Sequence, residues 1–268
     1  MKHFNLIGGG FQHAYSSTEW KKPENLVWDY ESKDNPVSVY CDDGIIRGLE
    51  DKNDGKKKYA WVLESRFISQ PYVNHIKDNL DQYLETYELF FVHHKELLDI
   101  HDKFVWCPAY GTYIKDIKIY PKTKTCSMIS SGKNSTSLHQ LRCQIIEKLK
   151  DNPSVDIFGR DINPIDNKEE GLCDYRFSIA IENDSYETYY TEKLLDCFAT
   201  GTVPIYIGPP NIGDHYDAGG IIPLTGTFDF STLTEDLYHS KMEHIKNNLD
   251  KTLELDVLDD WIYNTYLS

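Results

Sequence analysis

The chain has 268 residues, with 43 acidic against 28 basic side chains, so its formal net charge is −15. This charge argues against general binding to nucleic acid or to anionic membranes. No apolar run reaches the roughly 18 residues of a membrane span, and the first residues lack the apolar core of a signal peptide. We therefore expect a soluble, cytoplasmic protein without a membrane span, in which a few placed cations hold any anionic ligand.

The cysteines also indicate a cytoplasmic protein. There are six, they lie far apart, and they form neither a CxxC pair nor a short secreted framework. Reduced thiols are the expected state, although a bridge between two of them stays open.

In the first half of the chain, predicted strands alternate with helices. Strands are expected at 37–40, 59–63, 89–92 and 104–106, and a helix at 71–86. This alternation predicts a Rossmann-like layer. The pair Asp42 and Asp43 suggests a metal-binding DxD motif, but with Gly44 behind it a turn is favoured, where Asp and Gly occur for backbone reasons.

Glu64 is the candidate general base of this half. It follows the apolar strand predicted at 59–63, and a carboxylate at the end of a buried strand is held by rigid structure. The alternative is a solvated strand-end glutamate. His93 and His94 are not predicted to bind metal, because neighbours on an extended strand point opposite ways and no third ligand is suitably spaced.

A lysine-rich join at 115–125 is taken as the domain boundary, which gives domains 1–120 and 121–268. Beyond it, a strand starting at Cys126 leads into a polar loop that contains Lys133. A helix is expected at 138–149, with Arg142 beside its buried stripe. The Arg142 side chain either reaches a ligand or extends to water. The residues from Thr234 to Tyr266 are expected to be helical.

Residues 175–211 predict a strand, a loop, a helix and a second strand. Thr191 is the expected N-cap of the helix, and Gly201 lies where the helix ends. In such a βαβ unit the loop lies at the carboxyl edge of the sheet, where ligands bind. That edge would carry four polar residues, Asn183, Tyr189, Glu192 and Lys193. The alternative is a capped helix whose first-turn Glu and Lys are simply solvated.

This segment resembles a known family. The run FSIAIEN, the following loop, TEKL and then GTVPIYIG are similar to the donor-domain signature of the family 10 glycosyltransferases, the α-1,3/4-fucosyltransferases. The resemblance is to a soluble bacterial or viral type of member. It implies that Asn183, Tyr189, Glu192 and Lys193 bind the guanosine diphosphate of GDP-fucose. One departure is Asp184, where the family usually has Ser.

The resemblance extends to residues outside that segment. SSGKN, an Arg in the next helix and VDIFGR are similar to the entry of the family's donor domain, which implies that Arg142 binds phosphate and makes Lys133 a second, weaker candidate. Glu64 corresponds to the family's candidate base. The implied catalytic set is therefore Glu64, Arg142 and Lys193, with no metal site.

The implied fold class is α/β and GT-B-like, with two Rossmann-like domains facing across a cleft, the acceptor side first and the nucleotide side second. The implied reaction is inverting transfer of L-fucose from GDP-fucose to a glycan hydroxyl, with no further cofactor. The expected partners are thus a nucleotide-sugar donor and a glycan acceptor. Two alternatives stay open: another GDP-linked sugar as the donor, and an inactive relative that binds glycan or nucleotide.

Overall fold

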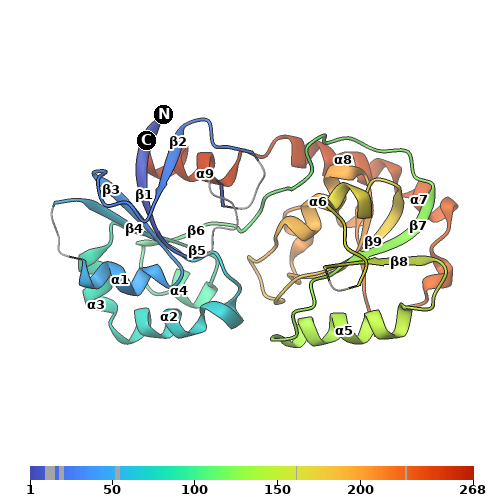
Figure 1. Ribbon diagram of the computed structural model, residues 1–268, viewed down its shortest axis with the longest axis horizontal. Coiled ribbons are helices and arrows are strands. Elements are labelled where there is room, and N and C mark those ends of the chain that lie inside the picture. Colours follow the sequence, from blue (N-terminus) through green and yellow to red (C-terminus); the bar gives the residue numbers. More distant parts are fainter. Residues whose placement is uncertain (10–15, 18–20, 52–54, 161, 227) are drawn as a thin grey trace. The chain divides into compact units, whose positions relative to one another are not determined.

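The computed structural model describes residues 1–9, 16–17, 21–51, 55–160, 162–226 and 228–268 (Figure 1). The chain divides into two compact units. The first unit comprises Met1–Gly111 together with Asp256–Ser268, and the second comprises Thr112–Leu255. The boundary predicted at residue 120 is therefore too late, and the last residues, assigned by sequence to the second domain, fold with the first.

The first unit contains a six-stranded parallel sheet in the order β2-β1-β3-β4-β5-β6. Helices α1 to α4 lie on one face, and α9 lies on the other (Figure 1). The strands are β1 (Lys2–Gly8), β2 (Leu26–Tyr30), β3 (Val37–Cys41), β4 (Lys57–Trp61), β5 (Leu89–Val92) and β6 (Phe104–Trp106). The helices are α1 (Gly44–Glu50), α2 (Arg66–Asp78), α3 (Leu80–Thr86), α4 (Lys95–Leu98) and α9 (Leu258–Ile262), which the π-helical turn η5 (Tyr263–Leu267) follows.

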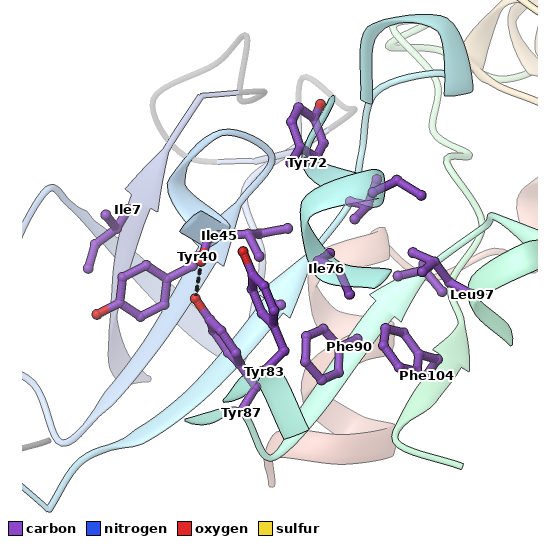
Figure 2. Packing of buried hydrophobic residues seen from close by; sticks show 14 residues of the cluster. Ile7, Tyr40, Ile45, Tyr72, Ile76, Tyr83, Tyr87, Phe90, Leu97 and Phe104 are labelled. Atoms are coloured by element: carbon purple, nitrogen blue, oxygen red, sulfur yellow. Dashed lines mark hydrogen bonds between the residues drawn. The ribbon is translucent and has the colours of Figure 1, made fainter. Parts of the chain in front are cut away.

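The single helix predicted at 71–86 is two helices. Asn79, with φ −127° and ψ 35°, leaves the helical conformation between α2 and α3. Both helices pack a buried face against the sheet, and Figure 2 shows this core, in which the Tyr87 hydroxyl donates a hydrogen bond of 2.6 Å to the carbonyl of Ile45. Because successive strand residues alternate between the faces, Ala60 belongs to this core while Trp61 belongs to the opposite face.

The C-terminal segment covers that opposite face. Phe4 on β1 packs edge-on against Tyr263, and Phe91 on β5 packs against Tyr266. Asp259 on α9 is buried and accepts a hydrogen bond of 2.6 Å from the indole nitrogen of Trp28. The segment Asp256–Ser268 is thus part of the packing of the first unit.

The second unit has a five-stranded parallel sheet in the order β11-β10-β9-β7-β8. Helix α5 lies on one face, and α6 and α8 lie on the other (Figure 1). The strands are β7 (Lys124–Ile129), β8 (Val155–Phe158), β9 (Tyr175–Ile181), β10 (Val203–Ile207) and β11 (Ile222–Pro223). The helices are α5 (Ser137–Leu149), α6 (Glu192–Thr200), α7 (Glu235–Ser240) and α8 (Met242–Leu253), and the 3₁₀ turns are η1 (Lys168–Gly171), η2 (Ile212–Asp214), η3 (Ala218–Gly220) and η4 (Phe230–Thr232).

Each unit is thus a parallel sheet with helices on both faces, which confirms the predicted α/β, Rossmann-like class. The helical stretch expected from Thr234 to Tyr266 is broken into α7, α8 and α9. In the described ranges, no helix combines the length and the apolar character that crossing a membrane requires.

Candidate functional site

Helix α6 begins at a side-chain cap on the carboxyl edge of the second sheet. The Thr191 hydroxyl accepts a hydrogen bond of 3.4 Å from the backbone nitrogen of Lys193. Gly201 ends the helix at φ 69°, a left-handed conformation that a residue without a Cβ adopts readily. Both features were predicted, and both are confirmed. They place Glu192 and Lys193 in the first turn of α6.

Glu182, directly after β9, fixes the start of this helix. Its carboxylate is fully buried and accepts hydrogen bonds from the Thr191 nitrogen (3.0 Å), the Thr191 hydroxyl (2.7 Å) and the Tyr206 hydroxyl (3.0 Å). The Lys193 ammonium lies 3.6 Å from Glu182 Oε2. A buried carboxylate is stable only when it is paired in this way. Glu182 therefore holds both the helix cap and the side chain of Lys193.

Glu192 is held between two lysines. Its Oε1 atom lies 3.2 Å from Lys193 Nζ and 3.4 Å from Lys168 Nζ. Burial alone would raise the pKa of Glu192, but the charges of Lys193 and Lys168 more than offset it and hold that pKa below its ordinary value. Glu192 is thus ionised near neutral pH and accepts hydrogen bonds only.

Arg142 and Asn183 meet at the same edge. Arg142 Nη2 donates a hydrogen bond of 2.6 Å to Asn183 Oδ1. The sequence placed Arg142 beside the buried stripe of its helix, yet the structure buries it more fully than Leu138, Leu141 or Ile145, which are half-buried. Arg142 Nε is buried and finds no hydrogen-bond partner among the described residues. Because such a donor is costly to leave unpaired, an acceptor from a ligand is expected there.

Tyr189 lies close to this pair. It is buried and stacks on Tyr186, with the ring centroids 5.1 Å apart. Burial lowers the pKa of Arg142, while Glu182, Tyr189 and Glu192 act in the opposite direction, which requires these three groups to lie near the guanidinium. The structure therefore brings the predicted residues Arg142, Asn183, Tyr189, Glu192 and Lys193 into one cluster.

Lys133 lies at the edge of that cluster. Its side chain is exposed and makes no hydrogen bond to any residue in the described part of the chain, but its charge contributes to lowering the pKa of His139. Sequence reasoning missed four members of the cluster. Lys168 and Glu182 are described above, Asp196 Oδ2 lies 2.6 Å from Lys168 Nζ, and His139 Nε2 lies 3.1 Å from Asn183 Oδ1. For Glu182 a signal was present, because it follows an apolar strand just as Glu64 was expected to.

Glu64 lies in the first unit, where a hydrogen bond to the side chain of Asp42 fixes its backbone. Asp42 Oδ1 accepts hydrogen bonds from the backbone nitrogens of Leu63 (3.0 Å) and Glu64 (3.2 Å) and from the Tyr72 hydroxyl (3.2 Å). Strand β4 ends at Trp61, so Glu64 does not directly follow it as predicted. Glu64 itself is half-buried.

Asp42 lies in the predicted turn, but a turn alone does not describe it. The residue has a positive φ of 46°, a strained backbone conformation for a residue other than glycine. Its side chain is buried rather than solvated. Its Oδ2 atom is buried and finds no partner within the described residues. Burial raises the pKa of Asp42 to about 7. Buried strain next to a candidate base is typical of a functional position.

His93 and His94 do not point opposite ways as predicted. Strand β5 ends at Val92, so the alternation of a strand no longer applies, and the two buried rings stack with centroids 4.5 Å apart. His94 Nε2 lies 2.6 Å from the Ser69 hydroxyl. In the described part of the chain, no group of three or more His, Cys, Asp or Glu residues is placed to hold a metal ion. The six cysteines, all of them described, are free thiols, as predicted.

Comparison with known proteins points to one family. A family model described as "Glycosyltransferase family 10 (fucosyltransferase) C-term" matches residues 119–226. A fucosyltransferase-like protein of Arabidopsis thaliana is 35% identical over 98 residues, which is 35% of this chain and 19% of that protein. The α-(1,3)-fucosyltransferase FucT of Helicobacter pylori is 31% identical over 103 residues, which is 37% of this chain and 21% of that protein. The matches thus span about a fifth of the length of these relatives.

The fold likeness is wider. A crystal structure of an α1,3-fucosyltransferase with GDP covers 94% of this chain and 82% of its own, with a TM-score of 0.50 and 14% sequence identity. Both units therefore take part in the similarity, and the predicted GT-B-like class is confirmed.

Proposed function

We propose that this chain, whose residues 119–226 match the family 10 model, is a glycosyltransferase of that family and transfers L-fucose from GDP-fucose to a hydroxyl of a glycan, with inversion at the anomeric carbon. One observation carries the proposal: the matched residues 119–226 contain the whole polar cluster at the carboxyl edge of the second sheet. In that cluster, Arg142 and Lys193 are the cations proposed to meet the diphosphate, Lys168 is engaged with Asp196 and Glu192, and Glu192 is an ionised acceptor. The relatives' names and the GDP complex of the structural neighbour support the choice of donor.

The negative charge of the leaving group explains why this cluster needs cations. In an inverting transfer the transition state resembles an oxocarbenium ion, and negative charge accumulates on the departing diphosphate. The free Nε–H of Arg142 would donate to a phosphate oxygen while Nη2 stays bound to Asn183. Lys193 would supply the second charge, and it is pre-positioned by Glu182 and by the Thr191 hydroxyl, 3.1 Å away. Lys133, exposed at the edge, is a weaker candidate for phosphate contact.

The remaining members of the cluster would orient the donor. Glu192 would accept hydrogen bonds from ribose hydroxyls, for which its ionised state is suited. Asn183 and Tyr189 would donate to phosphate or sugar. In this arrangement the second unit binds GDP-fucose, and the first unit supplies the acceptor side.

Glu64 would take the proton from the acceptor hydroxyl. The hydrogen bond from its backbone nitrogen to Asp42 Oδ1 supports this role, because a base must be held in one place to act. We also propose that no metal cofactor is needed, since Arg142 and Lys193 can neutralise the leaving group. The six free cysteines support a reducing, cytoplasmic setting.

The test is a comparison of nucleotides and nucleotide sugars. GDP is expected to raise the melting temperature much more than UDP or ADP, because binding to the native state stabilises by about 2.7 kcal/mol at a hundredfold excess over Kd. GDP-fucose is then incubated with and without glycan acceptors, with GDP-mannose as the matched alternative donor. An equal response to UDP would contradict the assignment. Binding of GDP without hydrolysis or transfer would identify an inactive relative, and turnover of GDP-mannose alone a different donor.

A further inference from the structure

His139 is a buried histidine to which the proposed mechanism gives no role. It lies in the first turn of α5, one helical turn before Arg142, and is 1% exposed. Its ring connects two parts of the second unit. On one side Nδ1 faces the backbone at the start of α5, and on the other Nε2 lies 3.1 Å from Asn183 Oδ1.

The backbone fixes the protonation of this ring. The Thr136 nitrogen lies 3.3 Å from His139 Nδ1, and a backbone N–H can only donate. His139 Nδ1 must therefore be an unprotonated acceptor. The Ser135 hydroxyl, 3.1 Å away, approaches the same atom. A neutral imidazole carries its single proton on the other nitrogen, so Nε2–H donates to Asn183 Oδ1. Burial and the charge of Arg142 lower the pKa of His139, which favours this neutral form.

The fixed ring in turn fixes the Asn183 amide. Asn183 Oδ1 accepts from His139 Nε2 and from Arg142 Nη2, which is also only a donor. Turning the amide over would set its NH₂ group against two donors. The NH₂ group is therefore held on the side away from α5, and no residue in the described part of the chain accepts from it.

We propose that His139 is a positioning residue for the donor site: through Nε2–H it holds the Asn183 amide so that its NH₂ group is presented to the diphosphate or sugar of the nucleotide-sugar ligand. This inference rests on the proposed function, which makes Asn183 a ligand contact. Arg142 alone would leave the amide with one anchor, on a side chain whose Nε–H is also proposed to bind phosphate. The Nε2–H of His139, by contrast, has no partner other than Asn183 among the described residues. With two hydrogen bonds the amide is already ordered before the ligand binds, so less conformational entropy is lost on binding.

The helix cap offers a variant that separates this role from folding. His139 is the third residue of a capping box with Thr136, and glutamine at that position completes such a box as well. His139→Gln is therefore expected to keep α5 capped while removing the donor to Asn183, because one side chain amide cannot reach both groups. Asn183→Asp keeps the acceptor for His139 and Arg142 and replaces the NH₂ donor with an oxygen. His239→Gln, at an exposed residue of α7, is the matched control.

Binding of GDP to the full chain is measured by calorimetry. His139→Gln should weaken it about 2- to 12-fold, the equivalent of one hydrogen bond, with an unchanged melting temperature without ligand. Asn183→Asp should weaken GDP binding more, and adding His139→Gln to it should have no further effect, since the two changes act through one contact. His239→Gln should bind like the unaltered protein.

Nitrogen NMR of the histidine rings provides a readout without ligand. The spectrum should show His139 with its proton on Nε2, and the side-chain NH₂ signal of Asn183 should shift in His139→Gln. A proton on Nδ1, or unchanged GDP affinity in a folded His139→Gln protein, would overturn the role of His139 and leave GDP binding standing. Failure of the unaltered chain to bind GDP would overturn the proposed function together with this inference.

Discussion

Lys168 Nζ lies 2.6 Å from Asp196 Oδ2, so an ion pair ties the turn η1 to the middle of helix α6. Asp196 also accepts hydrogen bonds from the Thr112 hydroxyl (2.9 Å) and the Tyr113 nitrogen (2.8 Å). Burial disfavours the charged form of both side chains, and it raises the pKa of Asp196. The positive charge of Lys168 lowers that pKa and so offsets part of the rise. Because Lys168 reaches Glu192 as well, this pair connects the packing of α6 to the charge of the candidate site.

Removing the lysine should therefore destabilise the second unit. Lys168→Met leaves the Asp196 carboxylate buried without its cation, which costs about 3 kcal/mol or more. The double variant Lys168→Met with Asp196→Asn removes both charges and should recover most of that loss. Hydrogen exchange of peptides from the second unit measures the effect. A single variant as stable as the unaltered chain would show that the pair does not stabilise α6.

Arg142→Ala and Lys193→Ala should each impair transfer more than folding. Loss of one charged contact that strengthens as the diphosphate departs costs on the order of 2 to 4 kcal/mol in the barrier. The measurement is kcat with GDP-fucose in protein checked for a native melting temperature. Arg160→Ala, at an exposed arginine of the same unit, is the matched control. A folded variant with near-full turnover would remove that residue from the mechanism, and a chelator should leave turnover largely intact.

Glu64→Gln should separate catalysis from donor binding. Glutamine keeps the shape of the side chain but cannot take a proton, so transfer should fall about 10²- to 10⁴-fold. GDP affinity, which depends on the second unit, should stay within about a few-fold. Glu88→Gln, at an exposed glutamate of the first unit, should leave both quantities unchanged. If GDP binding weakens while transfer persists, the base must be sought at Asp42 or at the neighbouring histidines.

Asp42 should make the stability of the first unit depend on pH. Its folded pKa of about 7 lies above the unfolded value of 3.8, so the folded state prefers the protonated acid. The stabilisation is complete below pH 3.8 and is lost as the pH rises through 7. Between pH 5.5 and 8 the free energy of unfolding should fall by about 2 kcal/mol more than in Asp42→Asn.

Tryptophan fluorescence is a suitable readout for that comparison, because Trp28, Trp61, Trp106 and Trp261 belong to the first unit and the sequence has no tryptophan between residues 112 and 255. Urea titrations of the unaltered chain and of Asp42→Asn at the two pH values cancel the contribution of other groups. Parallel pH dependence in both proteins would show that Asp42 is already ionised in the folded state.

The sequence predicted the elements that local signals define. The Thr191 cap and the Gly201 end of α6 follow from local backbone chemistry, and the strands on either side from their apolar runs. The features that the sequence could not predict depend on contacts between segments that lie far apart in the chain. Lys168 looks like a surface lysine until the fold brings Asp196 to it, and Asp42 looks like a turn residue until the backbone of Glu64 folds over it.

The same limit explains the errors in domain assignment. The segment Asp256–Ser268 reads as a continuation of the preceding helix, and only the burial of Asp259 against Trp28 shows that it belongs with the first unit. The placement of His139 beside Asn183 likewise needs α5 and β9 to be side by side, which no spacing along the chain reveals.

The return of that segment has a consequence for the order of folding during synthesis. Residues 112–255 leave the ribosome as one continuous stretch, and with them every strand of the second sheet. The first sheet, although translated earlier, has one face uncovered until α9 and the aromatic side chains of Tyr263 and Tyr266 emerge. The unit made first on the ribosome is therefore the last to complete its core, and a chaperone acting on the nascent chain would find its exposed apolar surface there.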